Sequence, residues 1–123
     1  MSTFTTPPGF HIHDALADGR LTIALSGELD IATAPAVLQC LDKHRGSHRG
    51  PVVIDLRSLS FLDSSGLRVL IAADSYARGD GWDLRILLQE SSPVRRTLEV
   101  SGLERMLPVE LVEHPAPITE TAA

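Results

Sequence analysis

The chain has 123 residues, a length that suits one domain around a single core. Apolar residues make up 43% and charged residues 22%, which argues against extensive disorder, and with only 4% aromatic residues aliphatic side chains must fill the core. A formal net charge of −5 disfavours a nucleic-acid-binding protein, because such a protein needs a broad positive face.

Both ends of the chain are expected to lie outside the folded core. Residues 1–9 are predicted to be a flexible leader and residues 113–123 a flexible tail, which leaves 10–112 as the domain. The first residues lack the basic and long apolar stretches of a signal peptide, and no apolar run approaches the roughly twenty residues that span a bilayer. We therefore expect a cytoplasmic protein that does not bind membranes.

The first elements are predicted to form an N-terminal hairpin. Residues 21–26 alternate between large aliphatic side chains and the smaller Thr22, Ala24 and Ser26, the pattern of a strand with one buried face. A weaker strand at 10–14 can pair with it through a turn at 17–19. The residues expected to face the core are Leu21, Ile23 and Leu25.

A helix is expected after the hairpin. Thr33 offers a hydroxyl as a cap, and Pro35 suits the first turn, where its missing N–H costs nothing. Cys40 is the only cysteine, which excludes an intramolecular disulfide, and it is interpreted as a small buried hydrophobe. The other side chains that this helix should bury are Val37, Leu38 and Leu41.

The rest of the chain alternates strands and helices. Strands are predicted at 51–56, 82–88 and 106–112, and helices at 66–77 and from Ser92 to Gly102. Gly79 and Gly81 are expected to end the first of these helices. The side chains expected to face inward are Leu67, Leu70 and Ile71 in the first helix and Val94, Leu98 and Ser101 in the second. Alternation of this kind predicts an α/β fold, with a mixed, mostly parallel sheet flanked by helices.

A basic cluster and a pair of histidines are candidate binding sites. Residues 43–50, "KHRGSHRG", are interpreted as a solvated helix end and loop, with an anion or RNA patch as the alternative. His11 and His13 share one side of a strand and could hold a metal, but no third ligand is evident. The sequence therefore predicts no metal site and no cofactor.

The stretch "SFLDSSGL" at 60–67 allows three interpretations of its serines. A nucleophile elbow, G-x-S-x-G, fails because Leu62 stands where its first glycine should be, and none of the five histidines is an obvious base. Alternatively, Asp63 or Ser64 caps a helix. A helix N-terminus also tolerates a phosphate, so a phosphoserine at Ser64 could leave the fold intact and release a partner by charge repulsion.

Three segments together resemble the anti-sigma factor antagonists of bacteria, which are single STAS domains. These segments are "LTIALSGELDIATAP", "VVIDLRSLSFLDSSGLRVL" and "VRRTLEVSGL". The resemblance implies a STAS-like fold and a partner-switching role without catalysis. It places the phosphoacceptor on Ser64 and a structural hydroxyl on Ser65, with Asp30 close to the phosphoacceptor and Asp63 as the acid of the motif.

The resemblance also implies the partners. The unphosphorylated antagonist binds an anti-sigma factor that is a serine kinase of the histidine-kinase-like ATPase fold, which frees a sigma factor. Phosphorylation ends the complex, and a metal-dependent phosphatase restores it. Arg68 departs from the family pattern, in which glycine is frequent. The residues predicted to bind the partner are Asp30, Asp63, Ser64, Ser65, Gly66, Arg68, Ala72 and Ser75.

The sequence also allows two other functions. The chain could be a STAS module of another regulatory assembly or of a lipid-trafficking complex. It could also be a small serine hydrolase, if a histidine lies within hydrogen-bond reach of Ser64 or Ser65.

Overall fold

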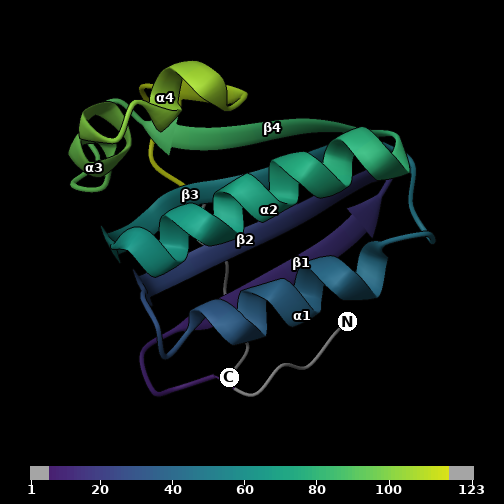
Figure 1. Ribbon diagram of the computed structural model, residues 1–123, viewed down its shortest axis with the longest axis horizontal. Coiled ribbons are helices and arrows are strands. Elements are labelled where there is room, and N and C mark those ends of the chain that lie inside the picture. The colour runs from purple at the N-terminus through teal and green to yellow at the C-terminus, as the bar shows by residue number, and fades with distance from the viewer. Residues whose placement is uncertain (1–5, 117–123) are drawn as a thin grey trace.

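The computed structural model describes residues 6–116, which form a five-stranded sheet with helices packed against it (Figure 1). The strands are β1 (His11–Ala17), β2 (Arg20–Leu29), β3 (Gly50–Leu62), β4 (Trp82–Gln89) and β5 (Val109–Val112). The helices are α1 (Ala34–His44), α2 (Ser64–Asp80), α3 (Arg95–Val100) and α4 (Leu103–Met106).

The strands lie in the order β1-β2-β3-β4-β5, and only the β1–β2 pair is antiparallel. This confirms the predicted mixed, mostly parallel sheet with an N-terminal hairpin. The hairpin turn consists of Asp18 and Gly19, whose φ angles are 53° and 77°. Positive φ at both turn positions matches the right-handed twist of the flanking strands, so the sequence Asp-Gly determines this connection.

Strands β2 and β3 end together, and this places two polar loops side by side. Leu29 pairs with Leu62, and the Asp63 N–H donates a hydrogen bond to the Leu29 carbonyl at 3.3 Å. The prediction that β3 stops at residue 56 is wrong. It runs to Leu62 because β2 continues beside it through two irregularities in register, a pairing that local sequence does not show.

Helices α1 and α2 lie side by side on one face of the sheet, and both begin at the edge where β2 and β3 end (Figure 1). Leu70 is fully buried, as predicted, whereas Ile71 is 47% exposed, so its prediction as a core residue is wrong. Successive residues of an α-helix are about 100° apart around its axis, so Ile71 points away from the face on which Leu70 lies. The buried residues of α2 are Gly66, Val69, Leu70, Ala73 and Ala77.

Several helices and strands begin or end at other residues than predicted. Helix α2 contains Gly79 and ends at Asp80, and Gly81, with φ 74°, provides the left-handed residue that follows it. The C-terminal helical segment breaks at Gly102, and a second short helix occupies the residues up to Met106. Met106 is therefore not in the last strand, which begins at Val109.

The C-terminal helical segment buries Val94 and Leu98 as predicted, but Ser101 is exposed. Its hydroxyl donates to the Leu98 carbonyl at 3.0 Å and accepts from the Leu103 N–H at 3.3 Å. Ser101 therefore supplies hydrogen-bond partners to backbone groups that the break between α3 and α4 leaves unpaired.

The ends of the described chain touch the domain. Phe10 is buried in the core, and its N–H donates to the Pro7 carbonyl at 3.2 Å. Near the other end, Arg57 donates to the Pro115 carbonyl at 3.2 Å. Residues 1–5 of the predicted leader and 117–123 of the predicted tail lie outside the described residues. Across 6–116, every helix is too short or too polar to traverse a bilayer.

Candidate functional site

Asp63 caps helix α2, as one of the sequence interpretations proposed. Its Oδ1 atom accepts hydrogen bonds from the Ser65 N–H at 2.9 Å and the Gly66 N–H at 3.3 Å. Its backbone is extended, as is usual for the residue that precedes the first helical one. Two of the N–H groups that a helix start leaves unpaired are thus satisfied by one carboxylate.

Ser64 is the first residue of α2 and is exposed. Because Asp63 supplies the cap, the Ser64 hydroxyl is not needed for it, and within residues 6–116 this hydroxyl forms no hydrogen bond. Ser65 is half-buried beside it. The structure thus separates the two serines, with Ser64 toward solvent and Ser65 closer to the body of the domain.

Gly66, which was predicted to contact the partner, is buried. A Cβ atom at this position would collide with the Leu62 side chain and lie 3.0 Å from Cγ of Leu29. The absence of a side chain therefore lets the first turn of α2 approach the ends of β2 and β3. This packing fixes the place of Ser64 at the start of α2, and a contact of Gly66 with a partner stays a prediction.

Asp30 organises the neighbouring loop between β2 and α1. Its Oδ1 atom accepts from the Ala32 N–H at 2.9 Å and from the Thr33 N–H at 3.2 Å. The predicted cap by Thr33 is wrong, because the chain already turns helically at residue 33. The Thr33 hydroxyl instead accepts from the Asp30 N–H at 2.9 Å and donates to the Glu28 carbonyl at 2.8 Å.

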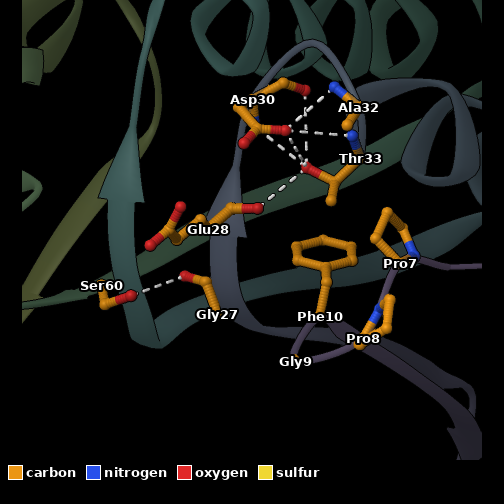
Figure 2. A pocket seen from close by; sticks show the side chains of 10 residues that line it. All are labelled: Pro7, Pro8, Gly9, Phe10, Gly27, Glu28, Asp30, Ala32, Thr33 and Ser60. Carbon is orange, nitrogen blue, oxygen red and sulfur yellow. Dashed lines mark hydrogen bonds between the residues drawn. The ribbon is translucent and has the colours of Figure 1, made fainter.

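A hollow of about 340 Å³ lies beside this loop (Figure 2). Pro7, Pro8 and Phe10 border it on one side, and the hydrogen-bonded pair Asp30 and Thr33 on the other. Exposed Glu28 also lines the hollow, and its backbone carbonyl accepts the hydrogen bond from the Thr33 hydroxyl (Figure 2). The end of β2 and the loop that follows it are therefore indented and carry two carboxylates, those of Glu28 and Asp30.

The outer side of α2 carries the other predicted contact residues. Arg68 and Ser75 are exposed, and Ala72 is half-buried between them at helical spacing. Sequence reasoning missed two exposed apolar residues at this end, Ile31 (79% exposed) and Phe61 (46%). Ile31 directly follows Asp30, and an isoleucine in a polar loop could have indicated an exposed apolar contact residue.

The histidines do not assemble a catalytic pair with either serine. In the part of the chain that the structure describes, neither Ser64 nor Ser65 shares a hydrogen bond with a histidine. His44 contacts Asp14, and His48 contacts the Pro51 carbonyl at 3.0 Å. The serine hydrolase interpretation gains no support from this arrangement.

The basic cluster at 43–50 is only partly the solvated loop that was expected. The His44 ring Nε2 lies 2.9 Å from Oδ2 of Asp14, and His48 is buried. Cys40 is fully buried, as predicted, and burial, followed by the negative charge of Asp14, raises the pKa of its thiol to about 12. Sequence reasoning paired none of these residues with Asp14, although Cys40 and His44 are four positions apart and so share one face of α1.

Sequence comparisons match most of this chain to one family of known proteins. The family model described as "Mlab, STAS domain" matches residues 12–113. The anti-sigma F factor antagonist of Paenibacillus polymyxa is 33% identical over 95 residues, which cover 74% of this chain and 78% of that protein. The anti-sigma-B factor antagonist of Listeria monocytogenes is 31% identical over 94 residues, which cover 76% and 82%.

Among solved structures, the chain resembles an anti-sigma factor antagonist from Mycobacterium paratuberculosis. The TM-score is 0.70 at 28% sequence identity, and the match covers 85% of this chain and 89% of that one. The match extends over nearly the whole of both chains, so it concerns the entire domain.

Proposed function

The chain belongs to the STAS-domain family of anti-sigma factor antagonists, and we propose that phosphorylation of Ser64 switches its binding to an anti-sigma factor. In this proposal the unphosphorylated chain binds an anti-sigma factor that is also a serine kinase of the histidine-kinase-like ATPase fold, and a sigma factor is freed. Phosphorylation ends the complex, and a metal-dependent serine phosphatase restores the binding form.

The observation that carries the proposal is the exposed, uncommitted hydroxyl of Ser64. Asp63 holds the first turn of α2 through the N–H groups of Ser65 and Gly66, so Ser64 can be modified without loss of the cap. The γ-phosphoryl group of the kinase's ATP moves to Ser64 Oγ: one P–O bond forms, the bond to ADP breaks, and the hydroxyl proton passes to a base of the kinase. This chain supplies the acceptor and no catalytic group.

The surroundings of Ser64 explain how a phosphate can release a partner while the fold persists. The N-terminus of a 17-residue helix favours negative charge, so a phosphate there is tolerated. A phosphoserine carries about −1.5 to −2 charges at pH 7. Added to Asp63, Asp30 and Glu28 at this end of the domain, it makes a concentrated negative patch, and like charges brought together in an interface cost several kcal/mol.

The proposed contact surface extends from Ser64 over the exposed residues around it. Ile31 and Phe61 provide apolar area, and exposed aromatic and aliphatic side chains in a mostly polar surface are typical of binding sites. Arg68, Ala72 and Ser75 continue it along α2. Small residues at 72 and 75 permit close approach of a partner.

A pull-down from a bacterial lysate with Ser64→Ala and Ser64→Asp baits tests the switch. We expect Ser64→Ala to retain an ATP-binding anti-sigma factor and Ser64→Asp to bind it at least about 100-fold more weakly, because about 2.7 kcal/mol of repulsion has that effect. Equal retention by both baits would contradict the switch. Retention of an ATPase assembly with no sigma factor in its circuit would instead favour the alternative STAS module.

The retained kinase and ATP should then add one phosphate to the native chain, located by mass spectrometry of its peptides. Ser65→Ala is the matched control, because it alters the neighbouring hydroxyl and leaves the Asp63 cap in place. We expect this variant to accept one phosphate on Ser64, and Ser64→Ala to accept none. A phosphate found only at another residue would overturn the assignment.

A further inference from the structure

At the end of the domain opposite Ser64, three potential metal ligands meet between β1 and α1. Helices α1 and α2 start at the same edge of the sheet, so the C-terminal end of α1 lies far from the start of α2 (Figure 1). Asp14 of β1 and Cys40 and His44 of α1 each offer one ligand atom, and these atoms all lie within 4.8 Å of one another. We propose that Asp14, Cys40 and His44 form a Zn²⁺ site that ties the end of α1 to the edge strand.

The distances suit a small tetrahedral ion. Zn²⁺ binds sulfur at about 2.3 Å and nitrogen or oxygen at about 2.0–2.2 Å, so its ligand atoms lie about 3.3–3.8 Å apart. The separations here exceed that range by at most about 1 Å, and the 2.9 Å between His44 Nε2 and Asp14 Oδ2 is a direct contact that a bound ion would widen by about 0.4 Å. Both adjustments are of the size that side-chain rotations in Asp14, Cys40 and His44 produce.

The ligand types favour Zn²⁺ over the harder cations. A thiolate and an imidazole prefer zinc, whereas Mg²⁺ and Ca²⁺ prefer oxygen ligands. Cys40 and His44 stand at positions i and i+4 of one helix, which directs both side chains to the same face. Asp14, from the neighbouring strand, supplies the third protein ligand, and water can complete a fourth position.

Charge and access support the site as well. One Zn²⁺, one thiolate and one carboxylate sum to zero charge, so the loaded site avoids the cost of burying a net charge. Asp14 and Cys40 are buried, whereas the His44 side chain is 16% exposed and leaves a route for the ion from solvent. On binding, the Cys40 S–H proton leaves to solvent as the Zn–S bond forms. The Lys43 ammonium, 3.9 Å from Asp14 Oδ2, sits on a half-exposed side chain that can move outward.

Titration of the reduced, tag-free, metal-free 123-residue chain with Zn²⁺ and with Co²⁺ tests the site. We expect one ion per chain, a rise in Tm with added Zn²⁺, and for Co²⁺ an ultraviolet thiolate-to-metal charge-transfer band. Absence of that band, or equally strong competition by Mg²⁺, would overturn the proposal.

Single substitutions assign the ligands. His44→Gln, at the partly exposed helix end, should weaken Zn²⁺ binding at least about 10- to 100-fold, since loss of even an indirect ligand contact has such an effect. Cys40→Ala should abolish the charge-transfer band, and if it does not fold, Asp14→Asn provides the second test. His13→Gln, on the exposed side of the same strand, should bind as the native chain does. Unchanged binding in His44→Gln would show that Asp14 and His44 form only a structural ion pair.

Discussion

The two ends of the helical layer hold their polar groups in different ways. At the Ser64 end, Asp63 and Asp30 accept hydrogen bonds from backbone N–H groups at most three residues away. At the far end, side chains from separate elements pair with each other: His44 with Asp14, and Arg45 with Asp80. The first end organises itself locally and leaves its surface open to a partner, whereas the second end joins β1, α1 and α2.

The largest predicted effect removes the close packing that the Ser64 end requires. Gly66→Val places a branched side chain against buried Leu62 and Leu29, and overpacking of this kind should lower the free energy of unfolding by about 3 kcal/mol, measured by urea titration. Gly79→Val is the matched control, because a Cβ at that position of the same helix meets nothing within 4 Å. Similar losses of unfolding free energy in both variants would show that the effect of valine on the helix itself, and not its packing, causes the destabilisation.

The next effect is the loss of the local cap. Asp63→Ala leaves the N–H groups of Ser65 and Gly66 without their carboxylate acceptor, which should cost about 1 kcal/mol of unfolding free energy. Asp63→Asn keeps an acceptor oxygen and should lose only a few tenths of a kcal/mol. If Asp63→Ala is as stable as the native chain, the cap does not secure this end.

A smaller, pH-dependent effect belongs to the far end. The hydrogen bond from the Arg45 side chain, followed by its charge and the Gly46 N–H, holds the pKa of Asp80 below its usual value. A carboxylate whose pKa is lowered by folding stabilises the fold above its unfolded pKa, near pH 4, and loses that contribution as the pH falls through its folded pKa.

Urea unfolding at a series of pH values checks this sign. The native chain should be more stable than Asp80→Asn at neutral pH, and the two should converge as the pH falls below about 4. Asp83→Asn, which changes an exposed carboxylate of β4, serves as the control. A stability difference that stays constant into strong acid would contradict an ionic role for Asp80.

The smallest predicted effect on stability is at Arg68. Its side chain is exposed on α2, so Arg68→Ala should change the free energy of unfolding by less than about 0.5 kcal/mol. Under the proposed function it should nevertheless alter the affinity for the anti-sigma factor, measured by calorimetry. Ser64 should remain phosphorylatable in this variant. Unchanged affinity would mark Arg68 as an ordinary surface residue.

The sequence by itself determined the features that depend on near neighbours. The Asp-Gly hairpin turn, the Asp63 cap and the burial of Leu70, Val94 and Leu98 were all predicted. Turn chemistry, capping and the spacing of apolar residues act over a few positions, so a single sequence displays them. The order of strands and helices and the resemblance to a family then predicted a mixed, mostly parallel sheet with an N-terminal hairpin.

Tertiary structure decided what depends on the register between distant segments. β3 extends to Leu62 because β2 pairs with it, and the rotation of α2 on the sheet buries Gly66 and exposes Ile71. Asp14 meets Cys40 and His44 only because α1 packs beside the edge strand. Such contacts join residues that are distant in the sequence: Asp14 and His44 are 30 positions apart, and Leu29 and Leu62 are 33 positions apart. A one-residue shift in pairing or a turn of one helix would change these contacts, so local pattern alone could not predict them.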